Sequence, residues 1–150
     1  MSEKQTTCAC CHPTSADNII YSDKVILSHV ADINIPGYLI VAIKRHIEEW
    51  SELENEEAAQ LMQVIQKTTK LLETIDEVER VYVCAFAELT RHLHLHIFPR
   101  YRNMLELADG ILDGPMIFKK AREQYACKAP LVNPTIDEII TTLKNKLSFY

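Results

Sequence analysis

Glycine is scarce in this chain, which has only three glycines among 150 residues. With so few glycines and no low-complexity tract or internal repeat, the sequence leaves little room for a flexible linker between domains. A chain of this length is long enough for one domain with a real core and too short for two comfortable ones. We therefore expect a single domain over residues 1–150.

Long basic runs and long apolar stretches are absent as well. The formal net charge is −5 and there is no lysine-rich tail, which argues against an electrostatic grip on nucleic acid or on an anionic membrane. No stretch is long and apolar enough to span a bilayer, and the polar start Met1-Ser2-Glu3-Lys4 does not open a signal peptide. We therefore expect a cytoplasmic protein with neither a nucleic-acid nor a membrane partner.

The five cysteines fit that compartment. Their odd number, with three crowded at positions 8, 10 and 11, is unsuited to a disulfide framework. In a reducing cytosol a close pair is more typical of a metal or redox site, and no thioredoxin-like strand–helix–strand pattern supports the redox reading. We expect Cys84 and Cys127 to be structural, because a free cysteine behaves as a small buried hydrophobe.

The apolar pattern in the first half predicts short strands followed by one long helix. Two β-prone runs within residues 19–27 indicate a hairpin, and a continuous apolar run over 38–43, after Pro36-Gly37, indicates a buried strand. Apolar residues then recur at helical spacing from Leu61 to Ile75, with Asn55 or Ser51 as the predicted helix cap.

The second half predicts two more strands and a final helix. The strands are expected over 80–87 and 92–98, the second ended by Pro99, which cannot donate to a sheet ladder. The last helix is expected from Thr135 to Leu147, opened by Pro134. This order of elements predicts an α+β domain with a largely antiparallel sheet.

Three histidines alternate with apolar residues in the run His92-Leu93-His94-Leu95-His96. Successive side chains of a strand point to opposite faces, so a continuous strand would place the three imidazoles on one face. The outer two would then lie roughly 13 Å apart at Cα, too far to meet easily on one metal ion. The three histidines are therefore better suited to different roles than to binding one metal ion together.

The middle imidazole, that of His94, suits attack on phosphorus. An imidazole ordinarily titrates near neutrality, so a large fraction is unprotonated at cellular pH. It can form a covalent intermediate that divides a difficult substitution into two easier steps. Its other nitrogen must be held by an acceptor, a task that a backbone carbonyl beside the strand could perform.

Cys8 and Cys11 form a Cys-x-x-Cys pair that can grip zinc, which usually takes four nitrogen or sulfur ligands. The other two ligands must come from elsewhere, and His46 and His92 are candidates. Reduced thiols without a metal are the alternative interpretation. Further candidate ligands are His12, His29 and, in place of Cys8 or Cys11, Cys10.

The run from His92 to Arg100 resembles the signature of the histidine triad (HIT) superfamily, in which alternating histidines carry the chemistry. Pro36-Gly37, Lys44-Arg45-His46 and the helix after Leu53 come in the family's order. The resemblance covers residues 8–102 and is closest to zinc-containing bacterial members. It implies a HIT-like α+β fold with a five-stranded, mostly antiparallel sheet, one long helix and a C-terminal helix, so that residues 103–150 form a C-terminal helical extension.

The resemblance also implies a function. Members of the family hydrolyse or transfer nucleotides at the α-phosphate of dinucleoside polyphosphates or nucleoside phosphoramidates. By position, His94 would form a nucleotidyl-histidine intermediate and His96 would contact the phosphate oxygens. The family is typically a homodimer. In zinc-bearing members a structural zinc is held by residues that correspond here to Cys8, Cys11, His46 and His92.

The chain departs from the family's pattern just before the triad. Many relatives carry a Gly-Gln pair there, whereas this chain has Thr90, which could donate a hydrogen bond to the nucleotide, and Arg91, which could offset phosphate charge. The carboxylate of Glu88, by contrast, would repel the phosphate. Arg100 and Arg102 also lie near, and a solvated surface role is the stronger interpretation for both.

Two other positions depart as well. Asp32 is displaced from the position of the acidic residue that binds ribose, and Pro-Gly-His is replaced by Pro-Gly-Tyr at Tyr38. Transfer of the nucleotide to an acceptor other than water, and a non-catalytic nucleotide-binding module stabilised by zinc, are the alternative functions.

Overall fold

The computed structural model describes residues 8–11, 18–126 and 134–147. Cys127 and His12, two residues of the sequence analysis, lie outside this part of the chain. The strands are β1 (Asn18–Tyr21), β2 (Val25–His29), β3 (Leu39–Ile43), β4 (Val78–Cys84) and β5 (His94–Tyr101). The helices are η1 (Trp50–Glu52), α2 (Asn55–Leu72), η2 (Arg102–Ala108), α3 (Gly114–Tyr125) and α4 (Ile136–Lys146).

The five strands form one sheet in the order β1-β2-β3-β5-β4, and every neighbouring pair is antiparallel. The α+β fold class and the β1–β2 hairpin are therefore confirmed. Leu95 and Ile97 of β5 join the core beneath α2. Because strand residues alternate faces, His94 and His96 lie on the opposite side of the sheet from α2.

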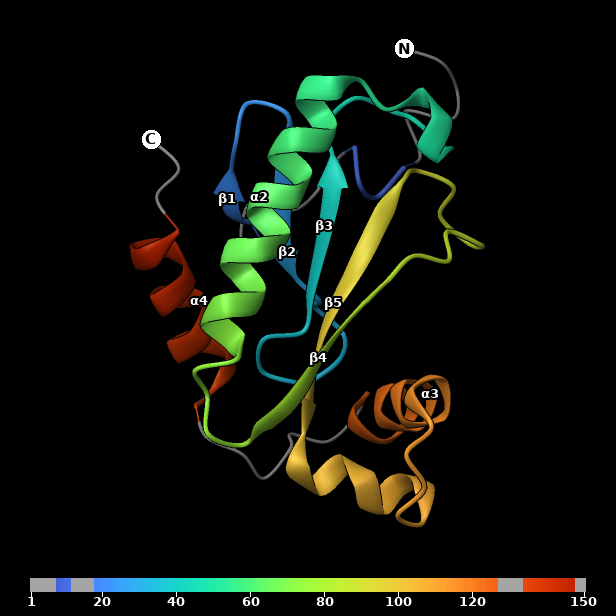
Figure 1. The fold of residues 1–150 in the computed structure, drawn as a ribbon, viewed down its shortest axis with the longest axis vertical. Coiled ribbons are helices and arrows are strands. Elements are labelled where there is room, and N and C mark those ends of the chain that lie inside the picture. Colours follow the sequence, from blue (N-terminus) through green and yellow to red (C-terminus); the bar gives the residue numbers. More distant parts are fainter. Residues whose placement is uncertain (1–7, 12–17, 127–133, 148–150) are drawn as a thin grey trace.

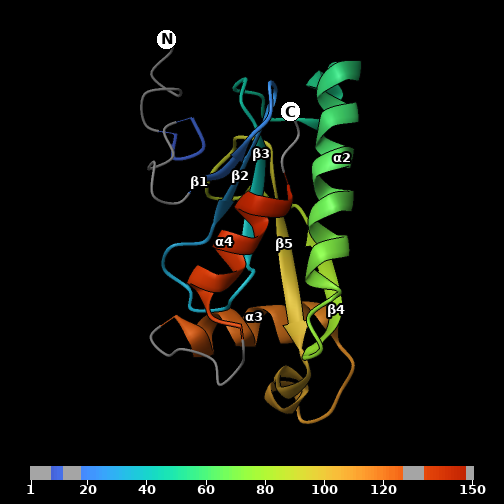
Figure 2. The ribbon, with the colours of Figure 1, turned by 90° about the vertical axis from the view of Figure 1, so that its left-hand side faces the viewer.

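α2 covers one side of the sheet, while the 8–11 turn lies on the other (Figure 2). The helix buries Leu61, Val64 and Leu72 at helical spacing, as the sequence predicts. Its cap is Glu54, not Ser51 or Asn55. The Glu54 side chain accepts a hydrogen bond from the backbone of the third helical residue, and that residue, Glu57, reciprocates.

The predicted C-terminal helix is confirmed as α4, which lies beside α2 (Figure 1). Thr135 caps its start in a reciprocal pair of hydrogen bonds with Glu138. Ile139 and Leu143 are buried in the same core as the apolar face of α2. No helix of the described residues is both long enough and apolar enough to cross a membrane.

α3 is a helix that the sequence analysis did not predict. The Asp113 side chain accepts a hydrogen bond from Met116 N, and a proline occupies the first turn, so the start is well defined. Ile117, Ala121 and Tyr125 are buried at intervals of four residues. They pack with side chains of η2 and β5 in a second core on the side of the sheet away from α2.

Pro99 does not end β5, which continues to Tyr101. β3 begins at Leu39, opposite Ile97, so β5 beyond that point pairs only with β4. A proline without a backbone N–H is tolerated where one side of the strand needs no donor. The prediction that Pro99 terminates the strand is therefore wrong.

Candidate functional site

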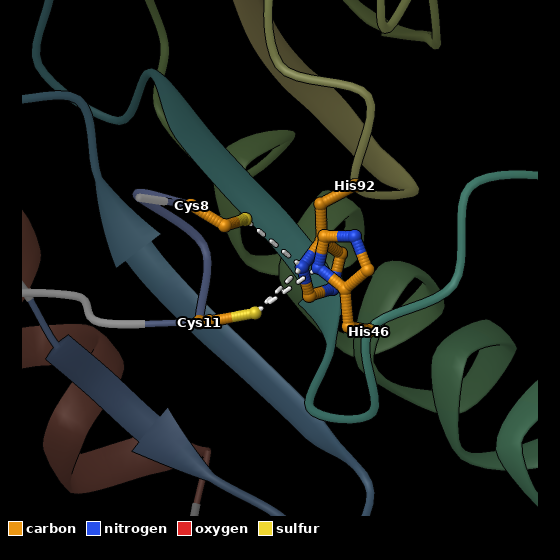
Figure 3. Close-up of side chains that lie close together, drawn as sticks. All are labelled: Cys8, Cys11, His46 and His92. Atoms are coloured by element: carbon orange, nitrogen blue, oxygen red, sulfur yellow. Dashed lines mark hydrogen bonds between the residues drawn. The ribbon is translucent and has the colours of Figure 1, made fainter. Parts of the chain in front are cut away.

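Four side chains from three distant segments converge on one point (Figure 3). One ligand atom from each lies within 4.8 Å of all the others; the residues are Cys8, Cys11, His46 and His92. Cys11 Sγ lies 3.2 Å from His46 Nδ1 and 3.4 Å from His92 Nδ1, and Cys8 Sγ lies 3.3 Å from His92 Nδ1. The group is a candidate metal centre, and Cys10 is not part of it.

The imidazole of His92 is held so that it can serve as a ligand. Its Nε2–H donates to the carbonyl of Ile43 at 2.6 Å, which leaves the lone pair on Nδ1, the atom that faces both thiols. Such an outer hydrogen bond fixes the ring and tautomer of metal-binding histidines. Two sulfur and two nitrogen atoms match the donor set of a four-coordinate metal centre.

His29, another candidate ligand, is engaged elsewhere. Its Nδ1–H donates to the carbonyl of Val30 at 2.9 Å, and its Nε2 accepts from the backbone N–H of Gly37 at 3.1 Å. Both nitrogens therefore stabilise the turn that precedes β3. Tyr101 adds a hydrogen bond from its hydroxyl to the carbonyl of Pro36 in the same turn.

The three histidines of the run do not lie on a single strand. β5 begins at His94, and His92 lies in the bend before it. The backbone N–H of Leu93 donates to the carbonyl of Ile47 at 2.7 Å, outside the sheet ladder, so the alternation of faces is interrupted before β5. His92 therefore turns to the cysteines and leaves His94 and His96 together, their ring centroids 5.3 Å apart.

His94 has the tautomer that the sequence analysis requires of a nucleophile. Its ring is buried, and its Nδ1 lies 2.7 Å from the carbonyl oxygen of His92. A carbonyl can only accept, so Nδ1 carries the proton and Nε2 carries the lone pair in the neutral ring. The expected backbone acceptor is thus supplied from two residues earlier in the chain.

His96 is held by Tyr38. The Tyr38 hydroxyl lies 2.8 Å from His96 Nδ1, and the tyrosine is completely buried. Burial, aided by His94 and Arg122, lowers the pKa of His96 to about 4, so the imidazole is neutral at cellular pH. Burial also raises the pKa of Tyr38 well above its usual range, so the hydroxyl stays protonated. When that hydroxyl donates to Nδ1, His96 presents Nε2–H as a donor.

Residues 13–103 match the HIT domain family model, which covers more than half of the chain. The chain belongs to the HIT family. Two curated relatives, both called AP-4-A phosphorylase and both from strains of Mycobacterium tuberculosis, are 27% identical over 100 residues. That match covers 61% of this chain and 51% of each relative, so the HIT protein spans about half the length of the curated relatives it matches.

Solved structures share the fold of this HIT protein. A zinc-bound histidine triad family protein from Mycobacterium smegmatis has a TM-score of 0.62 at 15% identity, covering 96% of this chain and 95% of that one. A histidine triad protein from Bradyrhizobium japonicum has a TM-score of 0.59 at 23% identity, covering 86% and 88%. These two similarities show a shared fold.

The two residues predicted to replace the Gly-Gln pair lie beside the metal group of this HIT protein. Thr90 and Arg91 line a cavity of about 270 Å³ together with Cys8, His46 and His92. The Arg91 guanidinium is exposed and forms ion pairs with Glu48 at 3.6 Å and Glu49 at 3.9 Å. Contact of Thr90 and Arg91 with a nucleotide stays a prediction.

The two arginines after the triad differ from each other. Arg102 is exposed and paired with Glu79 at 2.7 Å, as its predicted surface role requires. Arg100 is only 9% exposed, so it is not a solvated surface residue. It lies on β5 next to Tyr101, whose side chain is fully buried in the core formed with η2 and α3.

Several aromatic contacts of His96 could not be read from the sequence. Besides Tyr38, these are Phe86 and Phe118, whose ring centroids lie 6.3 and 5.6 Å from that of His96. Phe118 belongs to α3. The available signal was the sequence Asp-Gly-Pro followed by apolar residues at helical spacing, which would have placed this helix.

Proposed function

We propose that the protein is a nucleotide hydrolase that cleaves dinucleoside polyphosphates or nucleoside phosphoramidates at the α-phosphate through a covalent nucleotidyl-His94 intermediate. The observation that carries the proposal is the hydrogen bond from His94 Nδ1–H to the carbonyl of His92, which leaves the lone pair on Nε2. Membership of the HIT family and similarity to proteins called AP-4-A phosphorylase support a nucleotide as the substrate.

In the first step His94 Nε2 forms a bond to the α-phosphorus, and the bond from phosphorus to the leaving oxygen or nitrogen breaks. The leaving group takes the electron pair, and a leaving amine also takes a proton from solvent, so that it departs as a neutral amine. In the second step a water oxygen forms a bond to phosphorus, the phosphorus–nitrogen bond breaks and its electron pair returns to Nε2. The proton that the water loses passes to solvent, so His94 returns to its neutral form. His96, with Tyr38 as donor to its Nδ1, uses Nε2–H to donate to a non-bridging phosphate oxygen as charge develops.

We also propose that the metal bound by Cys8, Cys11, His46 and His92 is a structural zinc. Two thiolates and two imidazole nitrogens are a set that zinc prefers, and all four positions are supplied by the protein. Such a metal would cross-link the 8–11 turn, the loop after β3 and the bend before β5. Elemental analysis of the purified protein tests this, and an equimolar iron content would contradict zinc.

The proposed location is the cytoplasm, and the proposed domain includes the helices after residue 102. The proposed assembly is a homodimer. β4 is an edge strand of the sheet, and its Val83 side chain is exposed. The other edge strand, β1, is contacted by α4. Two copies of β4 could therefore pair across a two-fold axis. Light scattering on the purified protein tests this, and a monomeric mass at micromolar concentration would refute it.

The decisive experiment compares the parent protein with His94→Ala and His94→Gln on diadenosine tetraphosphate and adenosine phosphoramidate. Both variants should lose turnover while keeping the metal content and the unfolding temperature of the parent. Incubation with substrate labelled at the α-phosphate should yield a labelled protein adduct in the parent only. Undiminished turnover by His94→Ala, or turnover without any adduct in the parent, would refute the nucleophile assignment.

A second candidate function differs only in the acceptor. The name of the relatives, AP-4-A phosphorylase, favours inorganic phosphate as the group that receives the nucleotide. Offering phosphate in competition with water to the labelled intermediate separates the two reactions. A nucleoside diphosphate product indicates phosphorolysis, whereas a monophosphate indicates hydrolysis.

A further inference from the structure

A second cavity is separate from the one beside the metal group and shares no lining residue with it. Its volume is about 630 Å³, and its walls include Phe86 and residues of α3. α3 lies outside residues 13–103, the part of the chain that the family model matches. Among the residues that the structure describes, the charged side chains that line this cavity are Lys119, Arg122 and Glu123.

The cavity shares its aromatic wall with the histidine site. Phe118 and Phe86 each contact the ring of His96, and their own centroids lie 6.0 Å apart. Phe118 is buried, whereas Phe86 is 58% exposed. The two rings therefore connect His96 to the wall of the cavity.

The position of Arg122 is fixed by one of these rings. Its guanidinium carbon lies 5.3 Å from the centroid of Phe118, a cation–π distance. The same ring lies 5.6 Å from that of His96, so the guanidinium and His96 share Phe118 as a neighbour, and the positive charge of Arg122 helps to lower the pKa values of His96 and Tyr38. Lys119 adds a second cation, and Glu123 opposes them, so the three charged lining groups sum to a positive charge in a chain whose net charge is negative.

We propose that Arg122 binds a phosphate group of the substrate beyond the α-phosphate, and so makes the enzyme selective for polyphosphate nucleotides. This rests on the proposed function and chooses between its two substrate classes. A guanidinium matches phosphate oxygens with two parallel N–H donors, which Lys119 cannot do. A phosphoramidate carries only the α-phosphate and gives Arg122 nothing to bind. α3 thereby adds a specificity element to the HIT domain.

The test compares kcat/KM for diadenosine tetraphosphate and adenosine phosphoramidate in the parent, Arg122→Ala and Lys120→Ala. Lys120 lies on the same helix but does not line the cavity, so it controls for loss of a positive charge. Arg122→Ala should lose about 10- to 100-fold with the tetraphosphate, the effect of one charged hydrogen-bonded pair, and less than twofold with the phosphoramidate. Glu123→Gln should improve kcat/KM for the tetraphosphate a few-fold.

Equal losses on both substrates, or no loss in Arg122→Ala, would overturn the proposal. A binding measurement separates this result from failure of the proposed function. In the His94→Ala background, adenosine triphosphate should bind more tightly than adenosine monophosphate, and Arg122→Ala should abolish that difference. If neither substrate is turned over by the parent, the proposed function fails, while calorimetry with these two nucleotides still decides the role of Arg122.

Discussion

Replacing Tyr38 with phenylalanine removes a single oxygen atom from the interior of the protein. The tyrosine is completely buried, and its ring packs against Phe98 and Phe118 at centroid distances of 5.2 and 6.1 Å. Phenylalanine keeps these ring contacts. We therefore expect the free energy of unfolding to fall by only about 1 kcal/mol, the net contribution of one hydrogen bond.

The effect on turnover should be larger than the effect on stability. Without the hydroxyl, His96 Nδ1 loses its partner at 2.8 Å, and the neutral ring is free to carry its proton on Nδ1. It would then present a lone pair instead of N–H to the phosphate. Loss of a well-aligned donor to developing negative charge costs about 100- to 1000-fold in kcat, and retention of some Nε2–H tautomer lowers this to about 10- to 100-fold. KM should change little, because the bond strengthens mainly in the transition state.

The assay is steady-state kinetics on diadenosine tetraphosphate with the parent, Tyr38→Phe, His96→Ala and the double variant. Tyr38→Phe should have no further effect once His96 is gone, since the two act as one unit. Tyr38→His introduces the histidine that the family carries in its Pro-Gly-His segment, and its kcat should lie between those of Tyr38→Phe and the parent. The reasoning is refuted if Tyr38→Phe keeps kcat within twofold of the parent, or if its effect is undiminished in the His96→Ala background.

Cys11→Ser should remove the bound metal and lower the melting temperature by roughly 10 °C, whereas Cys10→Ser, outside the group, should retain both; metal analysis with calorimetry measures this. Because the folded-state pKa of His96, about 4, lies below its ordinary value, the unfolded chain binds more protons, so the parent should lose stability as pH falls from about 6.5 to 4. Urea titrations at pH 7 and pH 5 should show a smaller loss for His96→Gln. Gly37→Ala should cost more than about 1 kcal/mol in the same titration at pH 7, because Gly37 has a φ of +83° and a Cβ there would lie 2.7 Å from Leu72 Cδ2; a cost near zero would contradict this account of the turn.

Local sequence patterns predicted those parts of the fold that each element determines by itself. The apolar spacing of α2 and the Thr135 start of α4 are visible in the sequence, and both were predicted. The cap of α2 was not, because glutamate is an uncommon cap and Glu54 acts only together with Glu57. The continuation of β5 through Pro99 depends on where a different strand, β3, begins.

The four members of the metal group could be predicted from the sequence, whereas the geometry around the histidines could not. The spacing of Cys8 and Cys11 and the family's pattern pointed to the metal group that the structure brings together. The bend at His92 was not foreseen, because period-two alternation cannot distinguish a strand residue from one that precedes the strand. The hydrogen bond of Tyr38 with His96 and the place of Arg122 were not predicted, because both depend on the tertiary packing of β3, β5 and α3.

His92 serves two neighbours at once, through two different parts of the same residue. Its side-chain Nδ1 faces Cys8 and Cys11, while its backbone oxygen accepts a hydrogen bond from His94 Nδ1–H. Any ion held by the ring would therefore immobilise the peptide unit that orients His94, the proposed nucleophile. Slow removal of that ion should lower the rate of turnover in proportion to the metal lost, before the protein unfolds. The proposed activity would then last only as long as the metal cross-link.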